Sequence, residues 1–306
     1  MSASWQSDDP AMIRGHSVRP GLWLAVPAIT LVILFYVIPN VLNFVLSFTD
    51  WSSRRPNPSF IGTARFSELA GDEDVWDALC TTLRFAVMVM VIENIVALLL
   101  ALGLEKPSRF NTVMRTVFFL PVLISPLAAG YVFLSILQTQ GALNAILGAG
   151  TALVGLPVPQ IEWLANTTWT LVFIAFIHAW KFGGIHMLVY IAGLKAIPHE
   201  VIEAARIDGA SRWDLIRRVK MPLLAPAFTF NIALTLIGAL SIFDIVIATT
   251  RGGPARSTEV LNMVVFSVFG TGRFSYATAV SLVLFVVILL IAFPLIFFLR
   301  RREVRL

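Results

Sequence analysis

The chain has 306 residues, of which 58% are hydrophobic and only 13% are charged, and its mean hydropathy is +0.83. A soluble domain carries about twice that share of charge, so the composition excludes a protein that covers its own surface in water. The single cysteine excludes an internal disulfide. The net charge of +5 comes from basic residues scattered through short loops, which excludes a basic patch for nucleic acid. The composition therefore predicts an all-α integral membrane protein.

Six membrane-spanning helices are predicted along the chain. A helix needs about 20 mostly apolar residues to cross the bilayer. Three stretches without any Asp, Glu, Lys, Arg or His exceed that length, at 21–49, 221–243 and 274–299. Two further spans are predicted at 79–104 and 163–194, although each contains ionisable side chains.

The uncharged stretch 116–161 fits either one span with a loop or two spans. Lys and Arg in short loops collect on the cytoplasmic side of a membrane. One span here, with a cytoplasmic amino terminus, places most of the 23 Lys and Arg residues on the cytoplasmic side. Two spans would place the basic cluster at 195–220 on the outer side. The sequence therefore predicts one span, followed by an outer loop at 137–160 with a short helix along the membrane surface.

The predicted organisation is a six-span body between two short cytoplasmic tails. The amino-terminal tail covers 1–20, the body 21–299 and the carboxyl-terminal tail 300–306. The polar first residues are followed at once by a full-length apolar stretch, which is not the pattern of a cleaved signal peptide.

The cytoplasmic loop at 195–221 reads KAIPHEVIEAARIDGASRWDLIRRVKM and predicts a helix, a turn and a second helix. Pro198 suits the first turn of a helix, and Gly209 tolerates the left-handed backbone that ends one. Ser211 and Asp214 resemble a capping box at the start of the second helix.

Small side chains share one face of the first predicted helix. Val201, Ala204, Ala205 and Asp208 follow helical spacing, which permits close docking of another surface. The alternative is that the loop packs only on its own protein, and this alternative leaves Glu203 and Asp208 without a particular role.

The run EAARIDGASRWDLIRRVKMP at 203–222 resembles the EAA loop of permeases from binding-protein-dependent ABC importers. Val219 and Met221 stand where Ile and Leu are commoner in that family. The positions that match the family pattern are Glu203, Ala204, Ala205, Asp208, Gly209 and Pro222.

Other segments resemble the carbohydrate branch of the same family, in the type of its larger maltose permease and first glycerol-phosphate permease. They are SFTDW at 47–51, FIG at 60–62, RTVFFLP at 115–121, GALNAIL at 141–147, AGLKAIP at 192–198 and TTRGGP at 249–254. This resemblance implies the type I permease fold and a non-catalytic subunit that forms half of an alternating-access pathway.

The resemblance also implies the partners. They are a second, non-identical permease, a pair of ATPase subunits and an extracytoplasmic binding protein that delivers a sugar or related solute. ATP and Mg²⁺ belong to the ATPases, so no cofactor is expected on this chain, and the expected location is the cell inner membrane. Residues 200–209 become the coupling helix, with Glu203 as polar anchor, Ala204 and Ala205 as the packing surface, and Gly209 as the turn.

Ionisable groups inside spans mark functional sites by default. Glu93, beside Asn94, has two interpretations, an interhelical hydrogen bond or contact with a hydroxylated solute. Asp244 either lines the pathway or has a structural or gating role. Lys181 and His178 are interpreted as snorkelling or internally paired cations. Aromatic and amide groups typical of carbohydrate contact complete a predicted pathway lining at Trp180, Phe182, Asn231 and Phe243.

Two other classes of protein are compared. A membrane enzyme is disfavoured because the spans lack a His, Asp or Cys cluster at metal-ligand spacing and lack paired carboxylates on one helix. An ion-gradient-driven secondary transporter is the remaining alternative, although paired broken helices in two related halves are not evident. No G-x-x-x-x-G-K-[ST] loop occurs, so any ATP is bound by a separate subunit.

Overall fold

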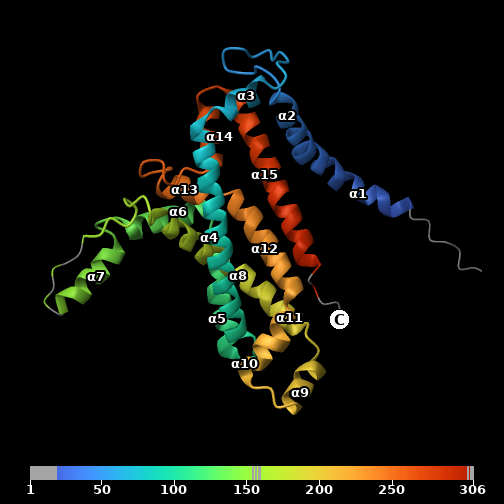
Figure 1. Cartoon of the computed structure of the whole chain (residues 1–306), viewed down its shortest axis with the longest axis vertical. Coiled ribbons are helices and arrows are strands. Elements are labelled where there is room, and N and C mark those ends of the chain that lie inside the picture. The colour runs from blue at the N-terminus through green and yellow to red at the C-terminus, as the bar shows by residue number, and fades with distance from the viewer. Residues whose placement is uncertain (1–18, 154, 156, 158–159, 302, 304–306) are drawn as a thin grey trace, which may run out of the picture. The chain divides into compact units, whose positions relative to one another are not determined.

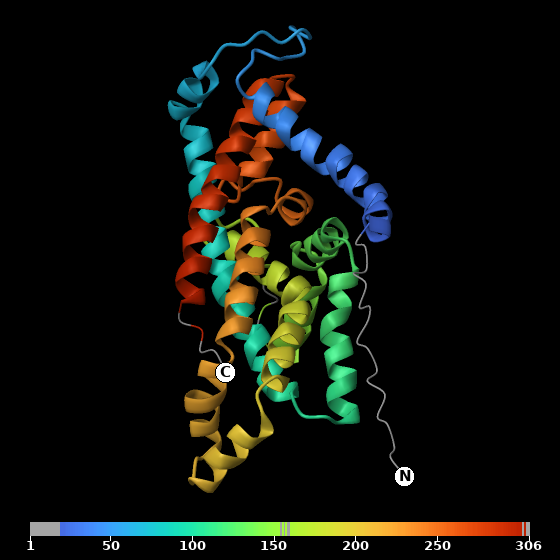
Figure 2. The same cartoon turned by 90° about the vertical axis from the view of Figure 1, so that its right-hand side faces the viewer.

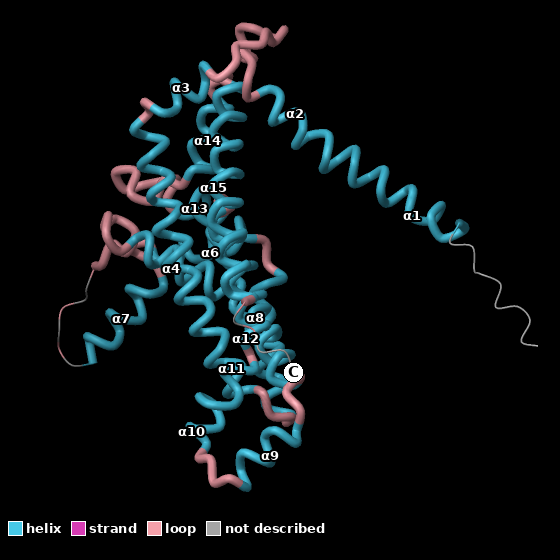
Figure 3. The backbone as a smooth tube through the Cα atoms, turned by 45° about the vertical axis from the view of Figure 1, so that its right-hand side comes forward, coloured by secondary structure: helices cyan, strands magenta, loops and turns pink. Residues whose placement is uncertain are grey.

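The computed structural model describes residues 19–153, 155, 157, 160–301 and 303, which are almost entirely helical (Figure 1). Figure 3 shows helices joined by loops, and the described part contains only isolated β-bridges. Most of the two predicted tails lies outside the described residues. The chain divides into two compact units, residues 1–45 and 46–306.

The first unit contains the first predicted span. Helix α1 (Arg19–Val32), the π turn η1 (Ile33–Val37) and α2 (Ile38–Leu46) follow one another without a loop. The Ile38 N–H bonds to the carbonyl five residues back, next to Pro39, which lacks an N–H to continue the α-helical ladder. Residues 25–46 are long and apolar enough to cross a membrane, and none of them is buried within the chain.

The second unit contains the remaining helices. Several of them begin at a side chain that accepts a backbone N–H bond, as Asp72, Ser108, Ser125 and Ser211 do. The elements are α3 (Ala64–Ala70), α4 (Glu73–Leu104), α5 (Arg109–Phe119), η2 (Leu120–Leu123), α6 (Pro126–Leu137), α7 (Ala142–Leu153), α8 (Thr170–Lys195), α9 (His199–Ile207), α10 (Arg212–Asp214), η3 (Leu215–Lys220), α11 (Met221–Leu223), α12 (Ala225–Leu240), α13 (Asp244–Thr249), α14 (Leu261–Gly270) and α15 (Phe274–Arg300).

Helix α4 is the central element of this unit. It packs along α8 and α12, and α12 packs in turn on α15 (Figures 1 and 2). Each of the three hydrophobic clusters contains residues of α4. In the middle of α4, Phe85 packs in a cluster with Ile174 and Leu236. Near the start of α4, Leu79 packs in a cluster with residues of α14 and α15, and near its end Ala101 packs in a cluster with residues of α8.

The candidate spans agree with the predicted number of six. Five helical segments of the described chain are long and apolar enough to cross a membrane, and a bent pair supplies a sixth. Helices α4, α8 and α15 correspond to predicted spans. The fifth span is bent by 66° between residues 212–223 and 225–240, where Pro222 and Pro226 lie.

The third predicted span differs in detail from the expectation. Residues 116–125 cover the end of α5, the short turn η2 and an extended residue before α6, and Pro121 and Pro126 interrupt the helical ladder there. The candidate span begins at Pro126 and runs to Leu153, so it includes the short helix α7. The surface position of α7 stays a prediction.

Helix α8 packs against the interruption between α5 and α6. Lys181 is 2% exposed, donates a hydrogen bond to the Val122 carbonyl at 3.3 Å and stacks over the Phe182 ring. It therefore satisfies a carbonyl freed by the break, and of the two interpretations, a snorkelling or an internally paired cation, the structure shows the internally paired one for Lys181. One turn on, Gly184 lies directly against the backbone of Phe118 and Phe119.

Replacing Gly184 tests this close approach. A Cβ at Gly184 meets the Phe118 carbonyl and lies 2.8 Å from the Phe119 Cα, both backbone atoms that move only with their helix. We expect Gly184→Ala to lower the free energy of unfolding by about 1–3 kcal/mol through overpacking. Gly183→Ala is the matched control, because a Cβ there meets nothing within 4 Å. Equal melting temperatures for the two variants in detergent would contradict the expectation.

Candidate functional site

The loop at 195–221 forms a projecting helix, a turn and a short second helix, as predicted. Helix α9 lies at the opposite end of the second unit from α3 (Figures 1 and 2). Gly209 ends the first helix with φ of 82°, a left-handed conformation that favours glycine. Ser211 begins α10 by accepting the Asp214 N–H at 3.2 Å.

The capping pair also fixes a charge on this surface. The Ser211 hydroxyl donates to the Asp214 carboxylate at 2.5 Å, instead of the carboxylate reaching back to a backbone N–H. This bond, together with the nearby Arg218 guanidinium, holds the pKa of Asp214 below its usual range. The turn between the two helices is therefore held by a carboxylate that is ionised at neutral pH.

The surface of α9 exposes apolar as well as polar side chains. Glu203 has a side chain 60% exposed and lies 3.1 Å from the His199 ring, one turn before it. Ile207, one turn after Glu203 and on the same face, is 86% exposed, and Trp213 is 66% exposed. Ala204 and Asp208 are exposed and Ala205 is half-buried, so the predicted small-residue face is partly open.

Sequence reasoning missed Ile207 and Trp213. Ile207 could have been identified from the sequence, because an isoleucine four residues after a glutamate lies on the polar face of an amphipathic helix. Large apolar side chains that are open at the tip of a projecting loop are typical of a protein-binding surface.

The projecting segment is attached firmly to the spans. Ile202 packs against the hydrophobic cluster at the ends of α4 and α8. Lys220 forms an ion pair with Glu105, the residue that follows α4. Arg115 of α5 donates to the Leu104 carbonyl at 3.0 Å. These contacts join α9 and η3 to the end of α4, to which Arg115 also joins α5.

A second site lies in the middle of the unit, where a glutamate is completely buried among three spans. The Glu93 Oε2 atom accepts a hydrogen bond from His178 Nδ1 at 3.0 Å, and its Oε1 atom lies 2.9 Å from His186 Nε2. An interhelical pairing therefore accounts for Glu93. The carboxylate has no exposed surface with which to contact a solute in this conformation.

Asn231 of α12 fixes the orientation of His186. Its side-chain NH₂ donates to the His186 carbonyl at 3.1 Å, so its oxygen faces His186 Nδ1 at 2.9 Å. An amide oxygen accepts only, so Nδ1 carries a proton. The other ring nitrogen, Nε2, faces the Glu93 carboxylate.

The next residue of α4, Asn94, extends the polar contacts one turn further along α8 and α12. Asn94 donates to Thr235 of α12 at 3.3 Å and accepts from the Tyr190 hydroxyl of α8 at 2.7 Å. Buried polar groups that are fully hydrogen-bonded specify one arrangement of the helices that carry them. This network therefore fixes α4, α8 and α12 in one register.

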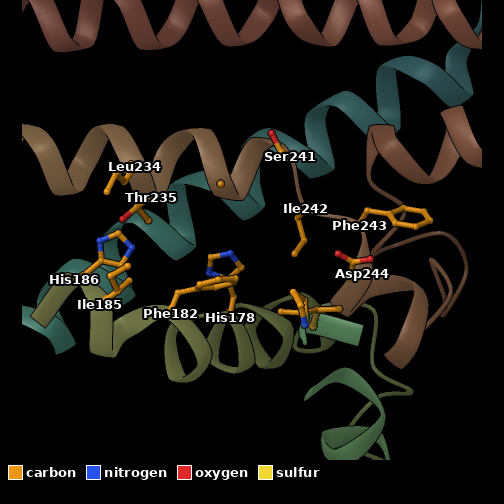
Figure 4. Close-up of a pocket in the computed structure, with 13 residues that line it drawn as sticks. His178, Phe182, Ile185, His186, Leu234, Thr235, Ser241, Ile242, Phe243 and Asp244 are labelled. Carbon is orange, nitrogen blue, oxygen red and sulfur yellow. The ribbon is translucent and has the colours of Figure 1, made fainter. Parts of the chain in front are cut away.

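A cavity of about 300 Å³ lies beside this network (Figure 4). His178, Phe182 and His186 of α8 face it from one side, while Thr235 and Ile242 face it from the other. The complete lining is Pro126, His178, Phe182, Ile185, His186, Leu234, Thr235, Gly238, Ser241, Ile242, Phe243, Asp244 and Ile245.

The cavity gathers part of the predicted pathway lining. Phe182, Phe243 and Asp244 line it. Glu93, Asn94 and Asn231 are buried in the network behind it and are absent from the lining. Trp180 is also absent, because it packs edge-on against Phe133 with 5.0 Å between ring centroids.

His178 and His186 line this cavity although sequence reasoning gave them little weight. They are eight residues apart on α8, so they share a face, but their common partner Glu93 is on another helix. Only the packing of α8 on α4 brings the three together. Among the described residues, no group of His, Cys, Asp and Glu side chains is arranged to hold a metal ion.

Comparison with known proteins gives consistent relatives over nearly the whole chain. A family model described as "Binding-protein-dependent transport system inner membrane component" matches residues 93–305. The chain is 31% identical to the probable starch degradation products transport system permease protein AmyD of Thermoanaerobacterium thermosulfurigenes, over 94% of this chain and 97% of that protein. It is 34% identical to the lactose transport system permease protein LacF of Rhizobium radiobacter, over 95% and 97%.

A similar fold is found among solved structures. A chain of a bacterial alginate ABC transporter, crystallised in complex with an alginate pentasaccharide-bound periplasmic protein, superposes with a TM-score of 0.77. It is 21% identical, and the match covers 91% of this chain and 93% of that one. At this identity the comparison establishes the fold alone.

The buried network is tested by Glu93→Ala. Removing the carboxylate leaves two buried imidazoles without their partner, so we expect the free energy of unfolding to fall by about 3–5 kcal/mol. The matched control is Glu200→Ala at an exposed glutamate, with an expected change within about 0.5 kcal/mol. Thermal melting of the full chain in detergent measures both, and a Glu93→Ala protein as stable as the control would exclude the stabilising role.

Proposed function

The chain belongs to the family of inner membrane components of binding-protein-dependent transport systems, and we propose that it forms half of the pathway by which an ABC importer takes up a sugar or related solute. Relatives that match nearly end to end are named as permeases for starch degradation products and for lactose. Proteins of this family are non-catalytic permease subunits, and separate subunits hydrolyse ATP. The chain is accordingly a multi-pass inner membrane protein.

The partners follow from this proposal. A second, non-identical permease completes the pathway, two ATPase subunits bind ATP and Mg²⁺, and an extracytoplasmic binding protein delivers the solute. The basic residues of η3, Arg217, Arg218 and Lys220, support a cytoplasmic position for the projecting loop. Both tails then lie on the same side as the loop.

The observation that carries the coupling role is the exposed surface of α9 and α10. Ile207 of α9 lies open one turn from Glu203, Trp213 of α10 is also open, and α9 is attached through Ile202 to the ends of α4 and α8. A surface of this kind fits a groove on an ATPase subunit, with Glu203 as the polar anchor and Ala204 and Ala205 allowing close approach. Movement of the ATPases then reaches the spans through Ile202 and the Lys220–Glu105 pair.

The cavity beside the buried network is the proposed solute pathway. Phe182 and Phe243 supply aromatic faces, Ser241 a hydroxyl and Asp244 a carboxylate, which is the combination that recognises a polyhydroxylated solute. A volume of about 300 Å³ is at the lower end of the range for ligand pockets. The second permease is expected to supply the facing half. Glu93 and Asn231 position the two histidines of the lining rather than contact the solute.

Charge reversal at Glu203 tests the coupling surface. We expect Glu203→Lys, and Gly209→Pro at the left-handed turn, to lower ATP-dependent uptake by at least about tenfold, which corresponds to about 1.4 kcal/mol of coupling. The protein should remain in the membrane and ATP hydrolysis should no longer be linked to uptake. Glu73→Lys makes the same charge change at the far end of α4 and is the control. Normal uptake by both variants in reconstituted vesicles would reject the assignment.

Two aromatic residues of α8, two positions apart, test the pathway. Phe182 lines the cavity, whereas Trp180 packs outside its lining on Phe133. We expect Phe182→Ala to weaken solute uptake several-fold, because an aromatic contact contributes about 0.5–1.5 kcal/mol. Trp180→Ala should leave the solute concentration for half-maximal uptake unchanged. The reverse pattern would place the pathway on the other face of α8.

A further inference from the structure

A second cavity, of about 790 Å³, opens on the side of the unit formed by the first half of α4 and the start of α8. It is separate from the proposed solute pathway and shares no lining residue with it. The lining residues are Thr81, Leu83, Arg84, Val87, Met88, Thr167, Thr168, Leu171 and Ser257.

Five of these residues are polar, and their side chains have no partner in the described part of the protein. Arg84 forms no ion pair or side-chain hydrogen bond, although it lies in an otherwise apolar stretch of α4. The hydroxyls of Thr81, Thr167 and Thr168 are likewise unpaired. The Ser257 Oγ atom is buried and unbonded, which normally costs about 1–3 kcal/mol. One cavity therefore collects a guanidinium and four hydroxyls that all lack partners.

The chemistry of this lining favours an anion rich in acceptor oxygens. A guanidinium offers five N–H donors in a planar fork that matches a phosphate group, and each hydroxyl adds a donor. No carboxylate lines the cavity. Of the acidic residues close to it in sequence, Asp74 and Glu259 pair with Arg256, and Asp77, two turns before Arg84 on α4, forms no ion pair with it among the described residues.

The position of these groups along the spans distinguishes a lipid from a soluble anion. Thr167 and Thr168 directly precede α8, and Ser257 lies in the loop between α13 and α14, so they lie where the spans end. Arg84 is about 16 Å along α4 from its first residue, within reach of that level for a long side chain that extends toward the interface. Toward the middle of the spans the lining is apolar, and its residues Leu83, Val87 and Met88 are suited to contact acyl chains.

We propose that this cavity binds the phosphate headgroup of a membrane phospholipid, in the leaflet that surrounds the first half of α4. Arg84 holds the phosphate, and the hydroxyls of Thr81, Thr167, Thr168 and Ser257 complete its hydrogen bonds. The site lies where α4, α8 and the loop after α13 meet, so the lipid bridges elements that otherwise leave these groups unpaired.

The test measures phospholipid bound to the purified full-length chain. Phosphatidylglycerol is added to delipidated protein in detergent, and the bound lipid is counted by native mass spectrometry across a concentration series. We expect Arg84→Gln to weaken this binding by at least about tenfold, because a charge-assisted contact is lost. Arg84→Lys should retain part of the affinity. The matched control is Arg54→Gln, at another exposed arginine without a side-chain partner among the described residues.

Three results would overturn the proposal. The first is equal binding of phosphatidylglycerol by the wild type and Arg84→Gln. The second is displacement of the lipid by millimolar inorganic phosphate alone, with equal protection of the protein against thermal unfolding, which would assign the site to a soluble anion. The third is weakened association of Arg84→Gln with a co-expressed partner permease while lipid binding is unchanged, which would assign Arg84 to a subunit contact. Melting of Arg84→Gln at the wild-type temperature in lipid-free detergent confirms that the variant is folded.

Discussion

The buried carboxylate of Glu93 is the interaction on which the second unit depends. A charged group in the apolar middle of a helix bundle is costly unless it is paired, and lipid offers no water to solvate it. Two histidines of α8 and, through one of them, Asn231 of α12 meet that requirement. The pairing is satisfied in one register of the three helices, so it converts a non-specific apolar association into a defined arrangement.

This arrangement connects the two candidate sites. The histidines that pair with Glu93 also line the cavity proposed as the solute pathway, and α4 and α8 continue from there to the end that holds the projecting helix. Under the proposed coupling, a movement of α9 reaches the same helices whose register the network fixes. Helix breaks occur at η2, which contacts α8 at the level of the cavity, and at Leu224. Proline residues interrupt the hydrogen-bond ladder at both places, and at η2 the Lys181 side chain satisfies the Val122 carbonyl.

The two cavities differ in the state of their polar groups. In the pathway cavity the histidines are already bonded to the protein, so the lining is rigid and presents aromatic and hydroxyl groups to a solute. In the second cavity Arg84 and Ser257 have no bonding partner among the described residues, so that lining gains hydrogen bonds only when an acceptor-rich ligand binds. The same physical rule, that a polar group away from water requires a partner, explains stability at the first cavity and supports the proposed lipid binding at the second.

Hydropathy, basic residues and the EAA-like run determined the membrane class, the number of spans and the projecting helix from sequence, because these features depend on local composition and on turn residues such as Gly209 and Ser211. The partners of Glu93, the buried position of Lys181 and the exposure of Ile207 were decided only by tertiary structure. Each depends on which face of one helix meets another, and residues 93, 178, 186 and 231 carry no local signal of their proximity. The spacing of apolar residues shows which face of a helix is buried, whereas only tertiary packing determines which other helix that face contacts.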